Sequence, residues 1–145
     1  LQPEVATLNA AQLEPSTLVK RAKVLLVEDN PVNQLVAKGM LGKLGCDVIV
    51  AAHGAEALDQ LEYHEFDLVL MDCNMPVMDG YEASRQIRQS GRWPNLPIVA
   101  LTANAMSEER ERCRAAGMSD YLAKPFRREE LAALLDQWIP TRTAP

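Results

Sequence analysis

Five short apolar runs recur along the chain, and each is followed by a segment in which apolar residues have helical spacing. The runs occupy residues 23–28, 47–52, 67–72, 97–103 and 120–125. Continuous apolar runs of this length are typical of parallel strands that are buried on both faces of a sheet. Strands that alternate with helices along a chain form a parallel sheet with helices on both of its faces. We therefore predict an α/β domain built around a five-stranded parallel sheet.

Helices are predicted over residues 31–44, 54–62, 81–88, 106–116 and 127–138. Asn30 and Pro31 mark the start of the first helix, because proline is favoured at the first helical position, and Gly45 marks its end. This order of elements predicts a doubly wound, flavodoxin-like sheet with strand order 2-1-3-4-5, in which residues 23–139 form one domain.

The segments outside this alternation lack a sustained apolar period. We interpret residues 1–22 as a linker or N-terminal tail, with a short helix over residues 5–13 left open, and residues 140–145 as a C-terminal tail. Since the chain begins without methionine, we expect it to be a piece of a longer protein.

The composition argues against two classes of partner. The net charge is −5 and no cluster of lysine and arginine is present, so direct binding of nucleic acid is not expected. No apolar run reaches the roughly 18 residues that cross a bilayer, so this segment is not expected to contact a membrane. The three cysteines, Cys46, Cys73 and Cys113, lack metal-binding spacing and favour reduced thiols. These features predict a cytoplasmic location.

Polar residues stand at the carboxyl ends of four of the five predicted strands. Glu28 and Asp29 end the first strand, Asp72 the third, Thr102 the fourth and Lys124 the fifth. Open parallel sheets bind ligands beyond the carboxyl ends of their strands, near the point where the strand order reverses. We therefore expect these side chains to converge on one site.

Three carboxylates at one site repel each other, and one lysine does not neutralise them. Two carboxylates about 4 Å apart repel by about 4 kcal/mol at an effective dielectric constant near 20. Mg²⁺ suits a site with one or two carboxylates, a carbonyl and several waters. We predict that Asp29 and Asp72 are direct ligands, that the Asn74 backbone carbonyl is a third, and that Glu28 acts through water. Any one of these acids taken alone could instead cap a helix or turn.

A carboxylate can also act as a nucleophile toward phosphorus and form an aspartyl phosphate. Phosphoryl transfer requires mainly positioning and neutralisation of the equatorial oxygens. Asp72 fits the nucleophile because its strand lies in the middle of the predicted order, and Mg²⁺, Lys124 and the Thr102 hydroxyl would each take one oxygen. Considered singly, Thr102 could bond the backbone, and Lys124 could be an ordinary surface lysine.

Three neighbouring features carry further expectations. A tight turn that directs Lys124 into a site is a place to expect a cis bond before Pro125. Gly80 is expected to supply a permissive backbone after the third strand. Asn74 and Asn104 lie two residues beyond Asp72 and Thr102 and are predicted to influence hydrolysis of a phosphorylated site.

Four segments of the sequence resemble the receiver (response-regulator) domains of two-component phosphorelays. They read LLVEDNPVNQ, LVLMDCNMPVMDGYEA, IVALTANA and YLAKPF, and together they extend over residues 23–139. The resemblance implies that Asp72 accepts a phosphoryl group from a phosphohistidine on a partner. It also implies that Glu28, Asp29 and the Asn74 carbonyl hold Mg²⁺, and that Lys124 contacts the phosphoryl group.

The resemblance further implies a conformational switch. Thr102 would move toward the phosphate and Tyr121 would change its rotamer, which alters the surface around the fourth helix and the fifth strand. Without the resemblance, Tyr121 reads as a half-buried strand aromatic. The fourth helix, residues 106–116, has a thin apolar face, so few contacts resist its movement.

The segment VEDNPVNQLVAKGMLGKLG is most similar to receivers of hybrid sensor histidine kinases. This similarity implies that the segment is a cytoplasmic part of a hybrid kinase, a class of protein that is membrane-anchored in some cases. The expected partners are the dimerisation domain that carries a kinase's phosphohistidine and a histidine phosphotransfer domain, with a weak homodimer left open. The first helix would be part of the docking surface, although its apolar stripe is expected to be mostly core. The domain itself would have at most autodephosphorylation activity.

Small departures and two alternatives accompany the resemblance. Glu28 stands where many members of the family have Asp. His53 is expected to be a solvated loop residue without a role. Cys73 is expected to be a small space-filling side chain. One alternative is a binding module of the same fold that works without phosphorylation. The other is a Mg²⁺-dependent phosphatase with an Asp nucleophile, although such enzymes of the haloacid dehalogenase type carry D-x-D on their first strand.

Overall fold

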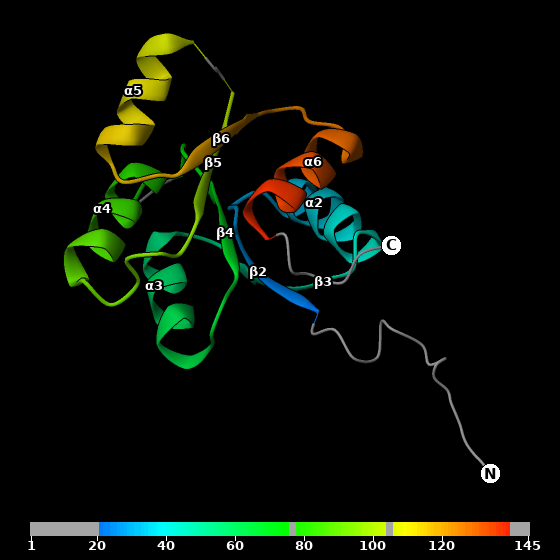
Figure 1. The fold of residues 1–145 in the computed structure, drawn as a ribbon, viewed down its shortest axis with the longest axis horizontal. Helices are drawn as coiled ribbons and strands as arrows, with labels where there is room; N and C mark the ends of the chain where they lie inside the picture. The colour runs from blue at the N-terminus through cyan, green and yellow to red at the C-terminus, as the bar shows by residue number, and fades with distance from the viewer. Residues whose placement is uncertain (1–20, 76–77, 104–105, 140–145) are drawn as a thin grey trace.

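The computed structural model describes residues 21–75, 78–103 and 106–139. Strands and helices alternate along the whole of this part of the chain (Figure 1). The elements are β2 (Ala22–Val27), α2 (Pro31–Lys43), β3 (Cys46–Ala51), α3 (Gly54–Tyr63), β4 (Leu68–Asp72), α4 (Gly80–Ser90), β5 (Ile98–Thr102), α5 (Ser107–Ala115), β6 (Asp120–Ala123) and α6 (Arg128–Trp138).

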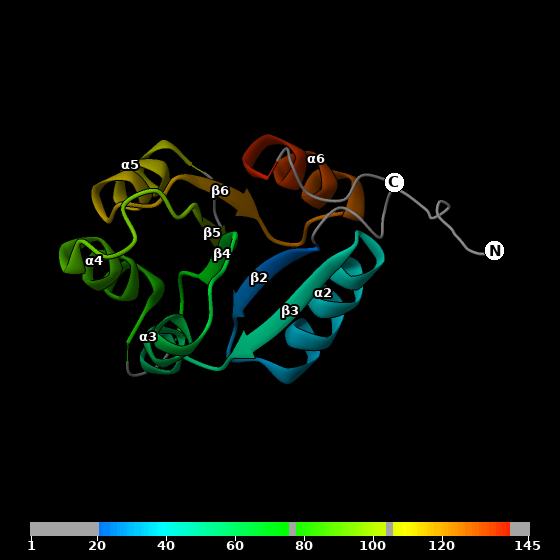
Figure 2. The same cartoon turned by 60° about the horizontal axis from the view of Figure 1, so that its bottom comes forward.

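The five strands form one parallel sheet in the order β3-β2-β4-β5-β6. This is the predicted order 2-1-3-4-5, so the doubly wound, flavodoxin-like fold is confirmed. Helices α2 and α6 cover one face of the sheet, and α3, α4 and α5 cover the other (Figures 1 and 2).

The central strand β4 belongs to two apolar cores, one on each side of the sheet. Leu68 and Leu70 pack with residues of α2 and α6, while Val69 and Met71 pack with residues of α3, α4 and α5. All four side chains are completely buried. Successive strand residues point to opposite faces, so a strand covered on both sides has to be apolar at every position. This burial holds the carboxyl end of β4 in place.

The ends of α2 follow the sequence signals. The Asn30 side-chain oxygen accepts hydrogen bonds from the backbone N–H groups of Val32 and Asn33 at 2.9 and 3.1 Å, which caps the helix. Pro31 is the first helical residue, and Gly45 follows the helix with a φ of 86°. Each of these positions agrees with the prediction.

The structure contradicts the prediction that the apolar stripe of α2 lies mostly in the core. Val32, Leu35 and Val36 are 66, 72 and 53% exposed, and within the helix only Ala37 and Leu41 are fully buried. The physical reason is that residues 32, 35 and 36 lie together on one helical face, whereas 37 and 41 lie on another. The helix therefore turns one apolar face to the sheet and a second one outward.

Two smaller expectations also need correction. His53 is a half-buried helix cap rather than a solvated loop residue, because its Nδ1 accepts a hydrogen bond from the Glu56 backbone N–H at 3.2 Å. Ala22 already belongs to β2, one residue before the predicted domain start. Residues 1–20, with the helix left open over 5–13, and the 140–145 tail lie outside the described residues, and Arg21 directly precedes β2. Across the described ranges, no helix has the length and apolar character that crossing a bilayer requires.

Candidate phosphoacceptor site

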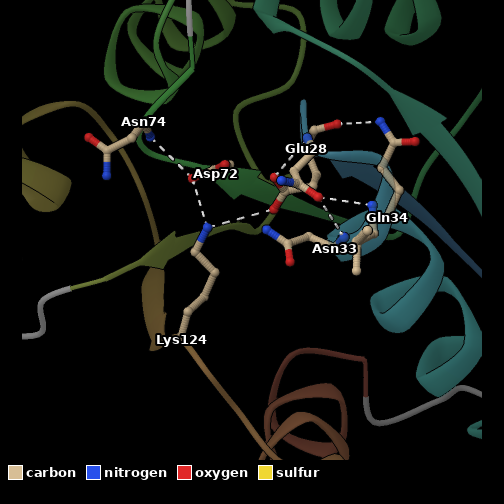
Figure 3. Close-up of polar contacts among 8 residues, drawn as sticks. Glu28, Asn33, Gln34, Asp72, Asn74 and Lys124 are labelled. Carbon is tan, nitrogen blue, oxygen red and sulfur yellow. Dashed lines mark hydrogen bonds and ion pairs between the residues drawn. The ribbon is translucent and has the colours of Figure 1, made fainter.

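Polar side chains from four neighbouring strands come together at the carboxyl edge of the sheet. Asp72 and Thr102 are the last residues of β4 and β5, and Glu28 and Lys124 directly follow β2 and β6. Figure 3 shows Glu28, Asp72 and Lys124 directed toward one another. In the described ranges, the buried polar or charged side chains are Glu28, Asp72, Ser84 and Thr102. Three of these four are predicted site residues, so polar burial is concentrated at the predicted site.

Lys124 places its ammonium group between two of the carboxylates. Its Nζ lies 3.3 Å from Asp72 Oδ1 and 3.7 Å from Glu28 Oε1 (Figure 3). The Lys124 backbone N–H donates to the Thr102 carbonyl at 2.7 Å, which extends the pairing of β6 with β5 by one residue. The bond between Lys124 and Pro125 is cis, as expected. Lys124 is thus directed at Asp72 rather than into solvent.

The three acids form a cluster of oxygen donors. One carboxylate oxygen from each of Glu28, Asp29 and Asp72 lies within 4.8 Å of the others. Glu28 and Asp72 are each only 2% exposed, whereas Asp29 is exposed. A cluster of hard oxygen donors with one side open to solvent suits Mg²⁺, which keeps several waters when bound. The residues present therefore fit the predicted metal.

The electrostatics of Glu28 reflect its burial first and the neighbouring Asp72 second. Burial raises the pKa of Glu28 above its ordinary value, and the nearby charge of Asp72 raises it further. A hydrogen bond from the Asn30 backbone N–H, at 3.2 Å, and the Lys124 ammonium both oppose that rise without cancelling it. The buried Glu28 carboxyl therefore favours its protonated form more than an exposed glutamate does.

The first turn of α2 supplies contacts that the sequence argument missed. Gln34 Nε2 donates to the Glu28 backbone carbonyl at 2.6 Å and so ties the helix to the end of β2. Asn33 lines the same cleft as Glu28 and Lys124, and its side-chain amide is directed toward that space (Figure 3). The Asn30 cap is a signal that could have found both, because a cap at residue 30 puts residues 33 and 34 in the first turn, beside the strand end.

The loop after β4 begins with a turn at the site. The Asn74 backbone N–H donates to Asp72 Oδ1 at 3.1 Å, and the Asn74 side chain is exposed. Its carbonyl as a metal ligand stays a prediction. Asn104, the other residue predicted to influence hydrolysis, lies outside the described residues.

Gly80 is required for a different reason from the one predicted. Positive φ angles occur at Gly45, Gly91 and Gly117 among the described glycines, and Gly80 is not one of them. A Cβ on Gly80 would instead collide with the Asp72 backbone oxygen. The glycine therefore allows a close approach of α4 to the site rather than an unusual backbone angle.

The two predicted switch residues lie on adjacent strands. Thr102 pairs with Ala123, and Tyr121 precedes Ala123 by two residues, so Tyr121 lies on the same face of β6 as that paired position. Tyr121 is half-buried, and the guanidinium of Arg110 on α5 lies 5.0 Å from the centre of its ring. Within α5 only Cys113 is fully buried, which confirms the predicted thin apolar face of that helix.

Comparisons with known proteins agree with this geometry. The chain matches the model of the response regulator receiver domain over residues 24–136. Sensor histidine kinase GacS of Pseudomonas protegens is 41% identical over 143 residues, which cover 93% of this chain and 15% of that protein. Hybrid signal transduction histidine kinase K of Dictyostelium discoideum is 41% identical over 124 residues, which cover 81% of this chain and 10% of that protein. The chain thus spans a small part of the length of these relatives.

A solved structure provides the corresponding comparison in three dimensions. The receiver domain of the sensor histidine kinase PA1611 from Pseudomonas aeruginosa is 50% identical, with a TM-score of 0.77 over 83% of this chain and 99% of that one. That structure holds a magnesium ion coordinated in its active-site cleft. The family match over most of the chain, the shared fold and the converging acids lead to one conclusion: this chain belongs to the response-regulator receiver domains of two-component signalling, with hybrid sensor histidine kinases among its relatives.

Proposed function

We propose that this domain takes a phosphoryl group onto Asp72 from a phosphohistidine on a partner protein. The observation that carries the proposal is the position of Asp72, a buried carboxylate at the end of the central strand with the Lys124 ammonium 3.3 Å away. One Asp72 oxygen attacks phosphorus, a P–O bond forms, and the P–N bond to the imidazole breaks. The imidazole leaves with the electron pair of that bond and takes a proton.

Charge neutralisation at the phosphoryl oxygens is the main catalytic demand of this step. Lys124 contacts one oxygen, and the Thr102 hydroxyl at the end of the next strand binds another. Asp29, Asp72 and the Asn74 carbonyl hold Mg²⁺ directly and Glu28 holds it through water. The bound ion supplies positive charge to a phosphoryl oxygen.

The phosphorylated state then acts in one of two ways. The domain passes the phosphoryl group to a histidine phosphotransfer domain, or Thr102 and Tyr121 rearrange and change the surface formed by α5 and β6. The small buried face of α5 supports the second route, because few apolar contacts have to break when the helix moves.

The exposed face of α2 is the proposed contact with the partner. Val32, Leu35 and Val36 lie within the first two turns of α2, whose start borders Glu28, and a contiguous apolar face beside an active site marks a protein-binding surface. The partner is the phosphohistidine-bearing domain of a histidine kinase or a phosphotransfer domain. A hybrid histidine kinase is the proposed parent protein, with this domain on its cytoplasmic side.

Phosphorylation by a small donor tests the proposal without any partner. The domain is incubated with Mg²⁺ and phosphoramidate, and its intact mass is measured with time. We expect a gain of one phosphoryl group in the wild type and none in Asp72→Asn. Asp79→Asn, a matched control in the same loop that preserves the side-chain cap of α4, should be phosphorylated normally.

The contrary outcomes are distinct. An absent mass gain, or a gain that persists unchanged in Asp72→Asn, would contradict a phosphoacceptor role for Asp72 and favour the binding module that works without phosphorylation. Steady turnover of a generic phosphate ester would indicate a phosphatase.

A further inference from the structure

A groove leads away from the phosphoacceptor site between α2 and the start of α6. Two adjoining cavities of about 310 and 520 Å³ make up the groove, and both are lined by Val36, Met40 and Phe126. The first cavity ends at Glu28 and Lys124. Helices α2 and α6 lie side by side on the same face of the sheet (Figures 1 and 2). The groove therefore has the reaction centre at one end.

The floor of the groove near the site is apolar. Its residues are Val36, Ala37, Met40, Leu101, Pro125 and Phe126. Leu35 adds an exposed apolar side chain on the outward face of the same helix. An apolar channel bordered by a helix fits the apolar face of a second helix laid along it.

The end of the groove away from the site is lined by positively charged side chains. Lys43, Arg127 and Arg128 line it together with a single carboxylate, Glu129. All three cationic residues are exposed, and in the described ranges none of them forms an ion pair. Helix α2 itself contains two lysines and no acid. The positive charge at this end of the groove is opposite in sign to the net charge of −5 on the whole chain.

We propose that the groove selects a partner helix that carries acidic residues nearly three turns from its phosphohistidine. Asn33 at the site and Lys43 at the cationic end are about ten residues apart along α2, which corresponds to roughly 15 Å at 1.5 Å per residue. A partner helix that packs along α2 covers the same distance with about the same number of residues. The inference rests on the proposed function, since it places the partner's phosphohistidine over Asp72.

Charge of this kind acts mainly on association and on the choice of partner. Complementary surface charges raise association rates and disfavour partners of the wrong sign, and salt weakens both effects. The cationic end of the groove should therefore affect transfer from a protein donor. It should have no part in the reaction of Asp72 with a small donor, which does not occupy the groove.

A pair of designed donors provides the test. The probe is a four-helix bundle with one exposed histidine, prepared in two versions with three Glu or three Lys residues on the same face, two to three turns from that histidine. Each version is phosphorylated with phosphoramidate, freed of the reagent and mixed with the domain and Mg²⁺. Transfer rates and dissociation constants are measured at low and high salt.

The expected result is a preference for the acidic donor. Transfer to the wild type should be about tenfold faster from the Glu version than from the Lys version at low salt, and the preference should collapse near 0.5 M salt. The triple variant Lys43→Glu, Arg127→Glu and Arg128→Glu should reverse the preference, and that reversal itself shows that the variant is folded. The matched triple Arg85→Glu, Arg92→Glu and Arg114→Glu, which carries the same charge change at positions away from the groove, should keep the wild-type preference.

Two results would overturn the inference. Equal rates from both donors would do so, and so would the absence of transfer from either donor while phosphoramidate still phosphorylates Asp72. Failure of the proposed function gives a different result, because phosphoramidate itself would then leave Asp72 unmodified, and the inference would fall with it.

Discussion

Gly80 packs against the backbone carbonyl of Asp72 so closely that no side chain fits between them. A Cβ at Gly80 would collide with that oxygen and would lie 2.9 Å from Met71 Cγ. The Gly80 backbone N–H also donates to the Cys73 carbonyl at 3.3 Å. The first turn of α4 is therefore packed against the residue that we propose as the phosphoacceptor, and the position of Asp72 depends on that contact.

Gly80→Ala should destabilise the domain by about 1–3 kcal/mol, because the added methyl group overpacks a site bounded by backbone. Phosphorylation of Asp72 should slow as well, since the Asp72 backbone has to shift. Urea unfolding and the phosphoramidate reaction measure the two effects. Gly42→Ala is the control, because nothing lies within 4 Å of a Cβ there, and alanine should stabilise α2 by up to about 1 kcal/mol. Equal stability changes in the two variants would show that the close approach of Gly80 to the Asp72 carbonyl does not limit which residue fits at position 80.

Glu28→Gln should stabilise the metal-free domain at neutral pH, because glutamine carries no charge that burial disfavours. Burial raises the pKa of Glu28, so its stability contribution is present below its ordinary pKa of 4.5 and is lost as pH rises through the higher folded value. The advantage of Gln should thus be largest near pH 7 and vanish toward pH 4. Thermal melts across this range measure it, and added Mg²⁺ should stabilise the wild type more than the variant. An advantage that grew toward low pH would refute this account of Glu28.

Arg88→Ala should cost about 2–3 kcal/mol of stability while Asp72 phosphorylation remains possible. The Arg88 guanidinium donates to the backbone carbonyls of Gly117, Trp93 and Leu96 at 2.8, 2.8 and 2.7 Å, so its removal leaves three carbonyls without this partner. Chemical denaturation measures the loss.

Arg85→Ala, one turn earlier on the same helix, is the matched control for Arg88. Its ion pair with Glu82 spans 2.8 Å, and both side chains are 46% exposed. Pairs of this kind contribute at most about 0.5 kcal/mol. A loss of similar size in both variants would mean that the carbonyl contacts of Arg88 contribute little.

Cys73 and Cys113 should react slowly with iodoacetamide in the folded domain at pH 8. Burial raises the pKa of both thiols, and they are only 1 and 4% exposed. For Cys73 the stability contribution is present below its ordinary pKa of 9.0 and is lost above it, because the unfolded chain then releases the proton first. Stability should therefore fall above pH 9, and less steeply in Cys73→Ala. Alkylation as fast in buffer as in urea would contradict this prediction.

The order of the strands and the residues at their carboxyl ends could be predicted because both follow from local periodicity. A run such as 67–72 is apolar at every position only when both faces are covered, and this identifies a central parallel strand. Once the strands are parallel, their carboxyl ends share one edge. The sequence therefore predicts that Glu28, Asp72, Thr102 and Lys124 lie together, and the structure brings them to that edge.

The outward apolar face of α2 could not be predicted in the same way. Periodicity shows that Leu35 and Leu41 are apolar positions of a helix, but it does not show which of them the sheet covers. Their exposed fractions are 72% and 0%. That difference depends on how the helix is rotated against β2 and β3, which only the packed structure decides.

Gly80 and His53 illustrate the same limit at single residues. The sequence singles out both residues, but the role of each depends on a contact. Gly80 packs against the Asp72 carbonyl, and His53 caps the first turn of α3. The sequence by itself determined which elements form and which residues end each strand, because helix and strand periods are local properties of the chain. Only the tertiary structure decided that Lys124 lies against Asp72 and Glu28, that Gly80 has no room for a side chain, and which face of α2 remains open, because these depend on distances between segments far apart in the chain.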